Sequence, residues 1–184
     1  YETDEDLLPR ALRRFMHKRV MEMAGAAILA AVALVGTALA TWHVNDPSLN
    51  YATSNPPQNL LGLPGAIVAD EILQMLGHGA VILLAVPFSW SLRLFNHQGI
   101  ARFWSGLVLW ITSLLALCAS LSTLRAFGNW PLSAGFGGIA GDLLSSGLVS
   151  LSALALKGKL ANILVFTLLA IVGIWSLAKA TGSG

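Results

Sequence analysis

The chain has 184 residues, of which 55% are hydrophobic and only 11% are charged, and its mean hydropathy is +0.71. Soluble domains carry about 25% charged residues, so this composition excludes an ordinary soluble protein and indicates an integral membrane protein. The net charge of +2 arises from few ionisable groups, which disfavours nucleic-acid binding, and the single cysteine, Cys118, excludes an internal disulfide.

The N-terminal segment, residues 1–19, is polar and basic. Three apolar residues, Leu12, Phe15 and Met16, recur at helical spacing among the basic residues Arg10, Arg13, Arg14, Lys18 and Arg19. This pattern is compatible with a short helix on an anionic membrane surface. A solvated segment that stops before the first span is the simpler interpretation, and we favour it. Both interpretations predict that the segment is cytoplasmic.

The first predicted span covers residues 20–42. No charged residue lies between Glu22 and Asp46, and a helix that rises 1.5 Å per residue crosses a core of about 30 Å over that distance. Gly25 and Gly36 predict close packing against another helix, because small residues let helices approach. A loop follows over residues 43–65, whose Asn and Pro residues disfavour regular structure.

The next apolar stretch is predicted as a short periplasmic interfacial helix over residues 66–76 and a second span over residues 79–95. Gly77, His78 and Gly79 interrupt the stretch between them. Pro87 is expected to kink the span unless neighbouring groups satisfy the freed carbonyl. One long tilted helix over residues 66–95 remains an alternative.

The second half of the chain is predicted to repeat this order. A third span covers residues 103–124, and a Gly-rich loop covers residues 126–141. A second interfacial helix over residues 138–156 leads into the fourth span, residues 160–178. Residues 179–184 are predicted to begin a cytoplasmic linker.

The distribution of basic residues predicts the orientation of the four spans. With the N-terminus inside, only Arg125, Lys157 and Lys159 among the Lys and Arg residues fall outside. This asymmetry predicts an N-in, C-in topology. Lys157 and Lys159 run against the rule and suggest a fifth crossing, but its charge-free part is too short to span a membrane. Tryptophans form an expected interfacial belt: Trp42 and Trp130 outside, and Trp90, Trp104 and Trp175 inside.

A short motif occurs in both outer loops. Gly65–Asp70 matches Gly137–Asp142, with Gly, Ile and Asp at equivalent positions. Each copy follows a turn-rich loop and opens an interfacial helix. We therefore predict an all-α membrane protein built as two parallel hairpin repeats, an arrangement known in other membrane proteins.

These loops supply the candidates for periplasmic capping or interaction, namely Gly65, Asp70, Glu71, Trp130, Pro131, Gly137 and Asp142. The glycines permit a tight turn close to a neighbouring backbone. The acidic residues are expected in the first turns of their helices, where a carboxylate meets the positive end of the helix dipole. The alternatives are a surface that binds another protein, or ion pairs with Lys157, Lys159 or Arg125.

The sequence carries no pattern of a catalytic, cofactor-binding or metal site. It has no Walker A, HExxH or CxxC motif. His43 and His78 lie near acidic residues on the outer side, but we interpret them as interfacial polar residues rather than metal ligands. The centres of the spans hold no ionisable residue, which disfavours a transporter, a channel or a pump.

Two strings in the outer loops resemble the periplasmic loops of the FtsK-type DNA translocase family. The first reads WHVNDPSLN at residues 42–50, with NLLGLPGA at residues 59–66. The second reads WPLSAGFGG at residues 130–138, with Ser133 where the family more often has Pro. Together with the four spans, the resemblance covers nearly the whole chain.

The resemblance implies a multi-pass domain of the bacterial inner membrane that anchors a DNA translocase at the division septum. The expected partners are the lipid bilayer, other division proteins and further copies of the chain. DNA, ATP and Mg²⁺ are expected only at a motor domain beyond this segment, since the sequence begins with Tyr1 and we expect a longer product. The alternative is a small accessory subunit of a larger membrane complex, which fits the missing site equally well.

Overall fold

The computed structural model describes residues 10–100, 102–124, 131–132, 134–152 and 159–182. Over these residues the chain forms helices and no strands, which confirms the all-α class. The elements are α1 (Arg10–Ala40), α2 (Gly62–Leu76), the 3₁₀ turn η2 (Gly77–Gly79), α3 (Ala80–Phe95), α4 (Phe103–Ser122), α5 (Gly138–Ser152) and α6 (Lys159–Thr181).

Four helical segments of the described chain are long and apolar enough to cross a membrane, which confirms the predicted number of candidate spans. They are Leu12–Ala40, Gly62–Phe95, Phe103–Ser122 and Leu160–Thr181. The second comprises both α2 and α3, which η2 joins without a loop. Many large apolar side chains on these helices are exposed, as expected where lipid tails replace water as the solvent.

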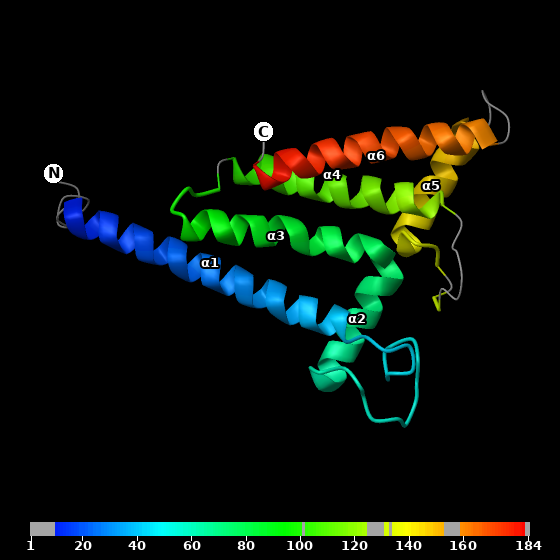
Figure 1. The fold of residues 1–184 in the computed structure, drawn as a ribbon, viewed down its shortest axis with the longest axis horizontal. Coiled ribbons are helices and arrows are strands. Elements are labelled where there is room, and N and C mark those ends of the chain that lie inside the picture. The colour runs from blue at the N-terminus through cyan, green and yellow to red at the C-terminus, as the bar shows by residue number, and fades with distance from the viewer. Residues whose placement is uncertain (1–9, 101, 125–130, 133, 153–158, 183–184) are drawn as a thin grey trace, which may run out of the picture.

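The four long helices lie side by side, and α2 and α5 run steeply to them at one end of the bundle (Figure 1). Helix α1 packs mainly against α3, and α4 packs mainly against α6. The start of α1 and the end of α6 lie away from α2 and α5 (Figure 1). Both described ends of the chain therefore face the same side of the bundle. Which side is cytoplasmic remains a prediction.

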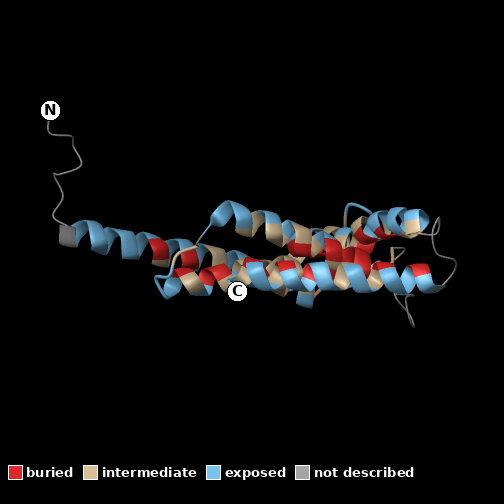
Figure 2. Cartoon of the chain, turned by 90° about the horizontal axis from the view of Figure 1, so that it is seen from above, coloured by how far each residue is buried: buried red, intermediate tan, exposed pale blue. Residues whose placement is uncertain are grey.

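Helix α1 begins earlier than the sequence predicted. It starts at Arg10 rather than at residue 20, so the basic residues extend the first span as one continuous helix. Residues 10–19 contain no Gly or Pro, and they comprise four Arg with Ala, Leu, Met and Lys among the rest, all of which favour helix. Residues 12–19 are exposed, and this part of α1 projects beyond the other helices (Figure 2). Residues 1–9 lie outside the described chain.

The stretch over residues 66–95 forms two helices, as the Gly77–Gly79 interruption predicts. Gly77 adopts a left-handed backbone with φ +54°, which ends α2. Helix α2 begins at Gly62, before the predicted residue 66, because the first turn of a helix tolerates Pro64. Helix α3 continues through Pro87 to Phe95. The interfacial position of α2 remains a prediction.

The later helices lie close to their predicted ranges. Helix α4 starts at Phe103 as predicted and ends at Ser122, and α5 starts at Gly138 as predicted. The predicted end of α5 at residue 156 falls outside the described residues. Helix α6 continues to Thr181, into the predicted linker, until Gly182 takes a φ of +81°. A left-handed glycine after a helix is a common C-terminal cap.

Small residues form the contacts between the long helices. A Cβ at Gly25 of α1 would lie 3.1 Å from the backbone oxygen of Ser91 in α3, and a Cβ at Gly173 of α6 would crowd Leu117 of α4. Buried Ala and Ser residues continue these contacts. The close packing predicted for the first span therefore occurs between α1 and α3 of the same chain. Helix faces that approach this closely gain van der Waals contact, which drives helix association in lipid.

Trp90, which the sequence predicted for the interfacial belt, is buried within the bundle. Its side chain is buried against α4 and the end of α6, and its ring lies 6.0 Å from that of Trp110. The indole N–H donates to the backbone oxygen of Ala180 at 2.9 Å, which joins α3 to the end of α6. Trp104 and Trp175 are exposed, as residues of a belt would be.

Candidate functional site

The described candidate residues lie at the end of the bundle formed by α2, α5 and the loops that precede them. Gly65 is buried in the second turn of α2, and a Cβ there would collide with Asn59. The expected tight turn at Gly65 is therefore wrong, because α2 has already begun at Gly62. The glycine instead allows the loop over residues 41–61 to lie directly on the helix.

The sequence predicted that the acidic residues of α2 lie in its first turn, and this prediction is wrong. Because α2 starts at Gly62, Asp70 and Glu71 lie in its middle, away from the positive end of the dipole. Asp70 is buried and accepts hydrogen bonds from the indole N–H of Trp42 at 3.3 Å and from the Gln74 amide at 2.8 Å. Its carboxylate therefore joins α2 to the end of the first span.

Glu71 forms a hydrogen bond with the first loop and does not cap the helix. Its carboxylate accepts a hydrogen bond of 2.7 Å from the side-chain amide of Asn50. Both residues are near the surface, so this bond contributes little to stability. The predicted alternatives, ion pairs with Lys157, Lys159 or Arg125, involve side chains outside the described residues.

Asp46 and Asn59 organise the first loop, and neither is among the candidate residues predicted from the sequence. The buried Asp46 carboxylate accepts the backbone N–H groups of Gln58 at 2.8 Å and of Asn59 at 3.0 Å. The Asn59 amide donates to the backbone oxygen of Ala38 at 2.7 Å, and its oxygen accepts from Leu61 N–H at 3.1 Å. Both residues occur in the strings that resemble the translocase family, which was the available signal.

The second loop is closed by Asp142. Its carboxylate accepts the backbone N–H of Gly135 at 2.8 Å, so the residue caps the loop before α5 rather than the first turn of the helix. Gly137 is buried, and a Cβ there would collide with the backbone oxygen of Cys118 in α4. Pro131 is exposed. Trp130 lies outside the described residues.

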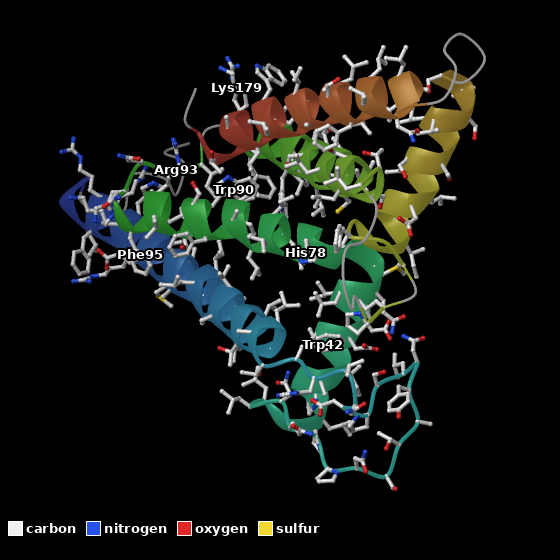
Figure 3. All side chains as sticks on the ribbon, turned by 45° about the vertical axis from the view of Figure 1, so that its right-hand side comes forward. Trp42, His78, Trp90, Arg93, Phe95 and Lys179 are labelled. Carbon is white, nitrogen blue, oxygen red and sulfur yellow. The ribbon has the colours of Figure 1, made fainter. Side chains whose placement is uncertain are left out.

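The segments around α2 and α5 meet where η2 contacts the loop that precedes α5. The backbone N–H of His78 donates to the backbone oxygen of Phe136 at 2.9 Å, and the rings of these residues lie edge to face at 5.3 Å. A Cβ at Gly77 would collide with the Phe136 oxygen, and a Cβ at Gly138 would lie 2.5 Å from the backbone of Met75. Figure 3 shows His78 at this end of α3. Glycines on both sides therefore let the backbones touch.

The polar groups at this end of the bundle are engaged within the fold, and apolar side chains are exposed there. In the described part of the chain, no three His, Cys, Asp or Glu side chains gather closely enough to hold a metal ion. The acidic side chains Asp46, Asp70 and Asp142 are engaged with neighbouring residues. The first loop presents apolar side chains instead: Leu49 and Leu60 are each 76% exposed, and Tyr51 is 49% exposed. Such side chains can bind a partner protein or lipid.

One family model matches the chain, the 4TM region of DNA translocase FtsK/SpoIIIE, over residues 17–181. This range contains nearly all of α1 and every later helix described. No solved structure gives a significant match.

Three relatives illustrate the likeness, each bearing the name DNA translocase FtsK. The protein of Agrobacterium fabrum is 43% identical over 133 residues, which are 72% of this chain and 15% of the relative. The protein of Bradyrhizobium diazoefficiens is 39% identical over 137 residues, 74% of this chain and 17% of the relative. The protein of Azospirillum brasilense is 32% identical over 176 residues, 94% of this chain and 27% of the relative. The chain thus spans a minor part of the relatives that it matches.

Proposed function

Because the chain belongs to the family of the 4TM region of DNA translocase FtsK/SpoIIIE, we propose that it is the membrane anchor of a DNA translocase that acts at the division septum in chromosome segregation. The observation that carries this proposal is the family match over residues 17–181, which covers all four candidate spans almost completely. The activity named for the relatives would belong to a motor outside the matched segment, and ATP and Mg²⁺ with it.

The anchoring role follows from the physics of the four spans. Each candidate span is long and apolar enough to cross the hydrocarbon core, so the chain remains in the membrane once inserted. Both described ends of the chain face the same side of the bundle (Figure 1). In the proposed N-in, C-in orientation, that side is the cytoplasm, and a motor attached after α6 meets the chromosome there.

The opposite end of the bundle would then face the periplasm and contact other division proteins. The exposed apolar residues of the first loop, Leu49, Tyr51 and Leu60, support this role. These residues lie on a loop that is held by two hydrogen bonds: Asp46 binds the backbone of the loop itself, and Asn59 binds the backbone of α1. The surface is therefore ordered before a partner binds. A preformed surface loses less conformational entropy on binding. Further copies of the chain are a second proposed partner, through exposed faces of the spans.

The decisive experiment exchanges the anchor in the full-length protein. In a strain that depends on that protein, residues 20–181 are replaced by an unrelated four-span segment with the same orientation. We expect the exchanged protein to remain in the membrane but to lose its septal position, as measured by fluorescence microscopy of a tagged copy. The native anchor with the same tag is the control. Normal septal position and chromosome segregation after the exchange would show that the segment supplies membrane attachment alone.

A further inference from the structure

A cavity of about 480 Å³ lies between α3, α4 and α6 at the end of the bundle opposite Trp42. Its lining combines cationic and aromatic side chains, among them Arg93, Arg102, Lys179, Trp90 and Trp175, and includes no Asp or Glu. Figure 3 shows Trp90, Arg93 and Lys179 at this end of α3 and α6. The cavity therefore has the charge to bind an anion.

The cations of this cavity are not neutralised by acidic residues of the described chain. The described ion pairs involve a different carboxylate, Glu22 of α1, which contacts Arg19 at 2.7 Å and His97 at 3.5 Å. Arg93 donates only long hydrogen bonds of 3.4 Å to the backbone oxygens of Gly99 and Gly182. Since a guanidinium has five N–H donors, Arg93 keeps others available for a ligand.

The walls of the cavity are fixed by contacts between the helices. Trp90 is held by its bond to the Ala180 oxygen, and the Ser89 hydroxyl donates to the Thr181 oxygen at 3.0 Å. The backbone oxygen of Arg102 accepts the Gly106 N–H and the Ser105 hydroxyl at the start of α4. Hydrogen bonds thus join the ends of α3 and α6, and the Trp90 ring lies 5.5 Å from that of Phe103 at the start of α4. Arg93 lies on α3, Arg102 directly before α4 and Lys179 on α6.

The exposed tryptophans at the cavity point to a lipid as its occupant. The neighbouring residues Trp104 and Trp175 are 76% and 58% exposed, as expected of tryptophans at the level of lipid headgroups. Helix α6 continues away from the cavity with exposed apolar side chains, including Leu168 and Ile171. An anion that carries acyl chains could bind the cations with its phosphate and lay its chains along this apolar surface.

We propose that this cavity binds the phosphate headgroup of an anionic phospholipid. Arg93, Arg102 and Lys179 pair with the phosphate oxygens, and the exposed face of α6 receives an acyl chain. Basic pockets between membrane helices are suited to such headgroups. The proposal is independent of the translocase role, because it needs only the cavity and a bilayer that contains anionic lipid.

The test compares two double variants of the whole 184-residue chain in neutral detergent, with lipid binding measured by native mass spectrometry. Arg102→Gln with Lys179→Gln removes two exposed cations from the cavity. Arg14→Gln with Lys18→Gln removes two cations of α1, outside the cavity, and changes the net charge equally. We expect the first pair to weaken phosphatidylglycerol binding about tenfold or more, and the second pair to leave it within about twofold.

Phosphatidylethanolamine and inorganic phosphate complete the design. Strong binding of phosphatidylglycerol but not of phosphatidylethanolamine supports an anionic lipid, and displacement by millimolar inorganic phosphate would assign the cavity to a free anion instead. Equal loss in the two double variants would reduce the effect to net charge and overturn the site. If the cavity double variant does not fold, the single variants Arg102→Gln and Lys179→Gln are measured in the same way, and unchanged binding in both contradicts the proposal.

Discussion

At the scale of single residues, the loop before α2 depends on buried polar groups that form hydrogen bonds to the backbone. Asp46 is 4% exposed and accepts two backbone N–H groups, and Asn59 is 4% exposed and bonds to the backbone at Ala38 and Leu61. A buried polar group is stable only when its hydrogen bonds are made. The loop over residues 41–61 has no helix or strand, and hydrogen bonds from these two side chains hold it in place.

Removing the Asp46 carboxylate should open this loop. Asp46→Ala leaves the N–H groups of Gln58 and Asn59 without their acceptor, and we expect a loss of about 2 to 3 kcal/mol in the local stability of the loop. Limited proteolysis within residues 43–61, in mild detergent, measures the opening. Glu71→Ala is the matched control, because that carboxylate accepts one surface bond, from Asn50. Equal cleavage of both variants would disprove the role of Asp46.

At the scale of helices and turns, the bundle is arranged by glycines that let backbones touch. Gly77 and Gly138 bring η2 against the second loop, and Gly137 and Gly141 bring α5 against the end of α4 near Cys118. Gly147, two turns further along α5, has open space where a Cβ would lie. The same helix thus carries two glycines that the packing requires, Gly138 and Gly141, and one that it does not, Gly147.

This difference predicts opposite effects of the same substitution. Gly141→Ala places a methyl group against the Cys118 oxygen and Ser122 hydroxyl, and overpacking of this kind should cost about 1 to 3 kcal/mol. Gly147→Ala should be neutral or stabilise by up to about 1 kcal/mol, since alanine favours helix. Unfolding in mixed detergent micelles, followed by circular dichroism, gives both free energies. A stability order with Gly141→Ala above Gly147→Ala would show that α5 does not pack on α4 in this way.

At the scale of the whole molecule, the helices form two packed pairs, α1 with α3 and α4 with α6. Contacts between α2 and α5 join the two pairs. The predicted pair of hairpin repeats stays a prediction, and the two matched aspartates form different contacts. Asp70 binds side chains of α1's end and of α2, whereas Asp142 binds the loop before α5. The two copies of the motif therefore share the order of their helices but not the contacts of their aspartates.

The orientation of the whole molecule can be tested with single cysteines in a Cys118→Ser background. Ser146→Cys on α5 should react with a membrane-impermeant maleimide added to cells whose outer membrane alone has been permeabilised. Met16→Cys and Lys179→Cys should react only after the inner membrane is opened, because the N-in, C-in topology puts both in the cytoplasm. All three positions are exposed in the structure. Labelling of Met16→Cys and Ser146→Cys under the same condition would overturn the topology.

The sequence alone determines much of the secondary structure and the number of candidate spans. Long charge-free apolar runs, and their interruption at Gly77–Gly79, are local properties of the chain, and the helices follow them closely. The start of α1 at Arg10 was missed because helix propensity continues past the edge of the apolar run. The start of α2 at Gly62 was missed because Pro64 reads as a loop signal, yet the first turn of a helix tolerates proline.

Only the tertiary structure decides how the polar and aromatic residues are used. Trp90 is a core residue because α6 returns to it, and Asp70 binds Trp42 because α2 folds back onto the end of α1. The cavity of Arg93, Arg102 and Lys179 exists because the end of α3, the start of α4 and the end of α6 meet. Each of these features joins residues far apart in the sequence, so no local pattern contains it. Hydrophobicity selects the segments that enter the membrane, and packing between them creates the surfaces that can bind a ligand or partner.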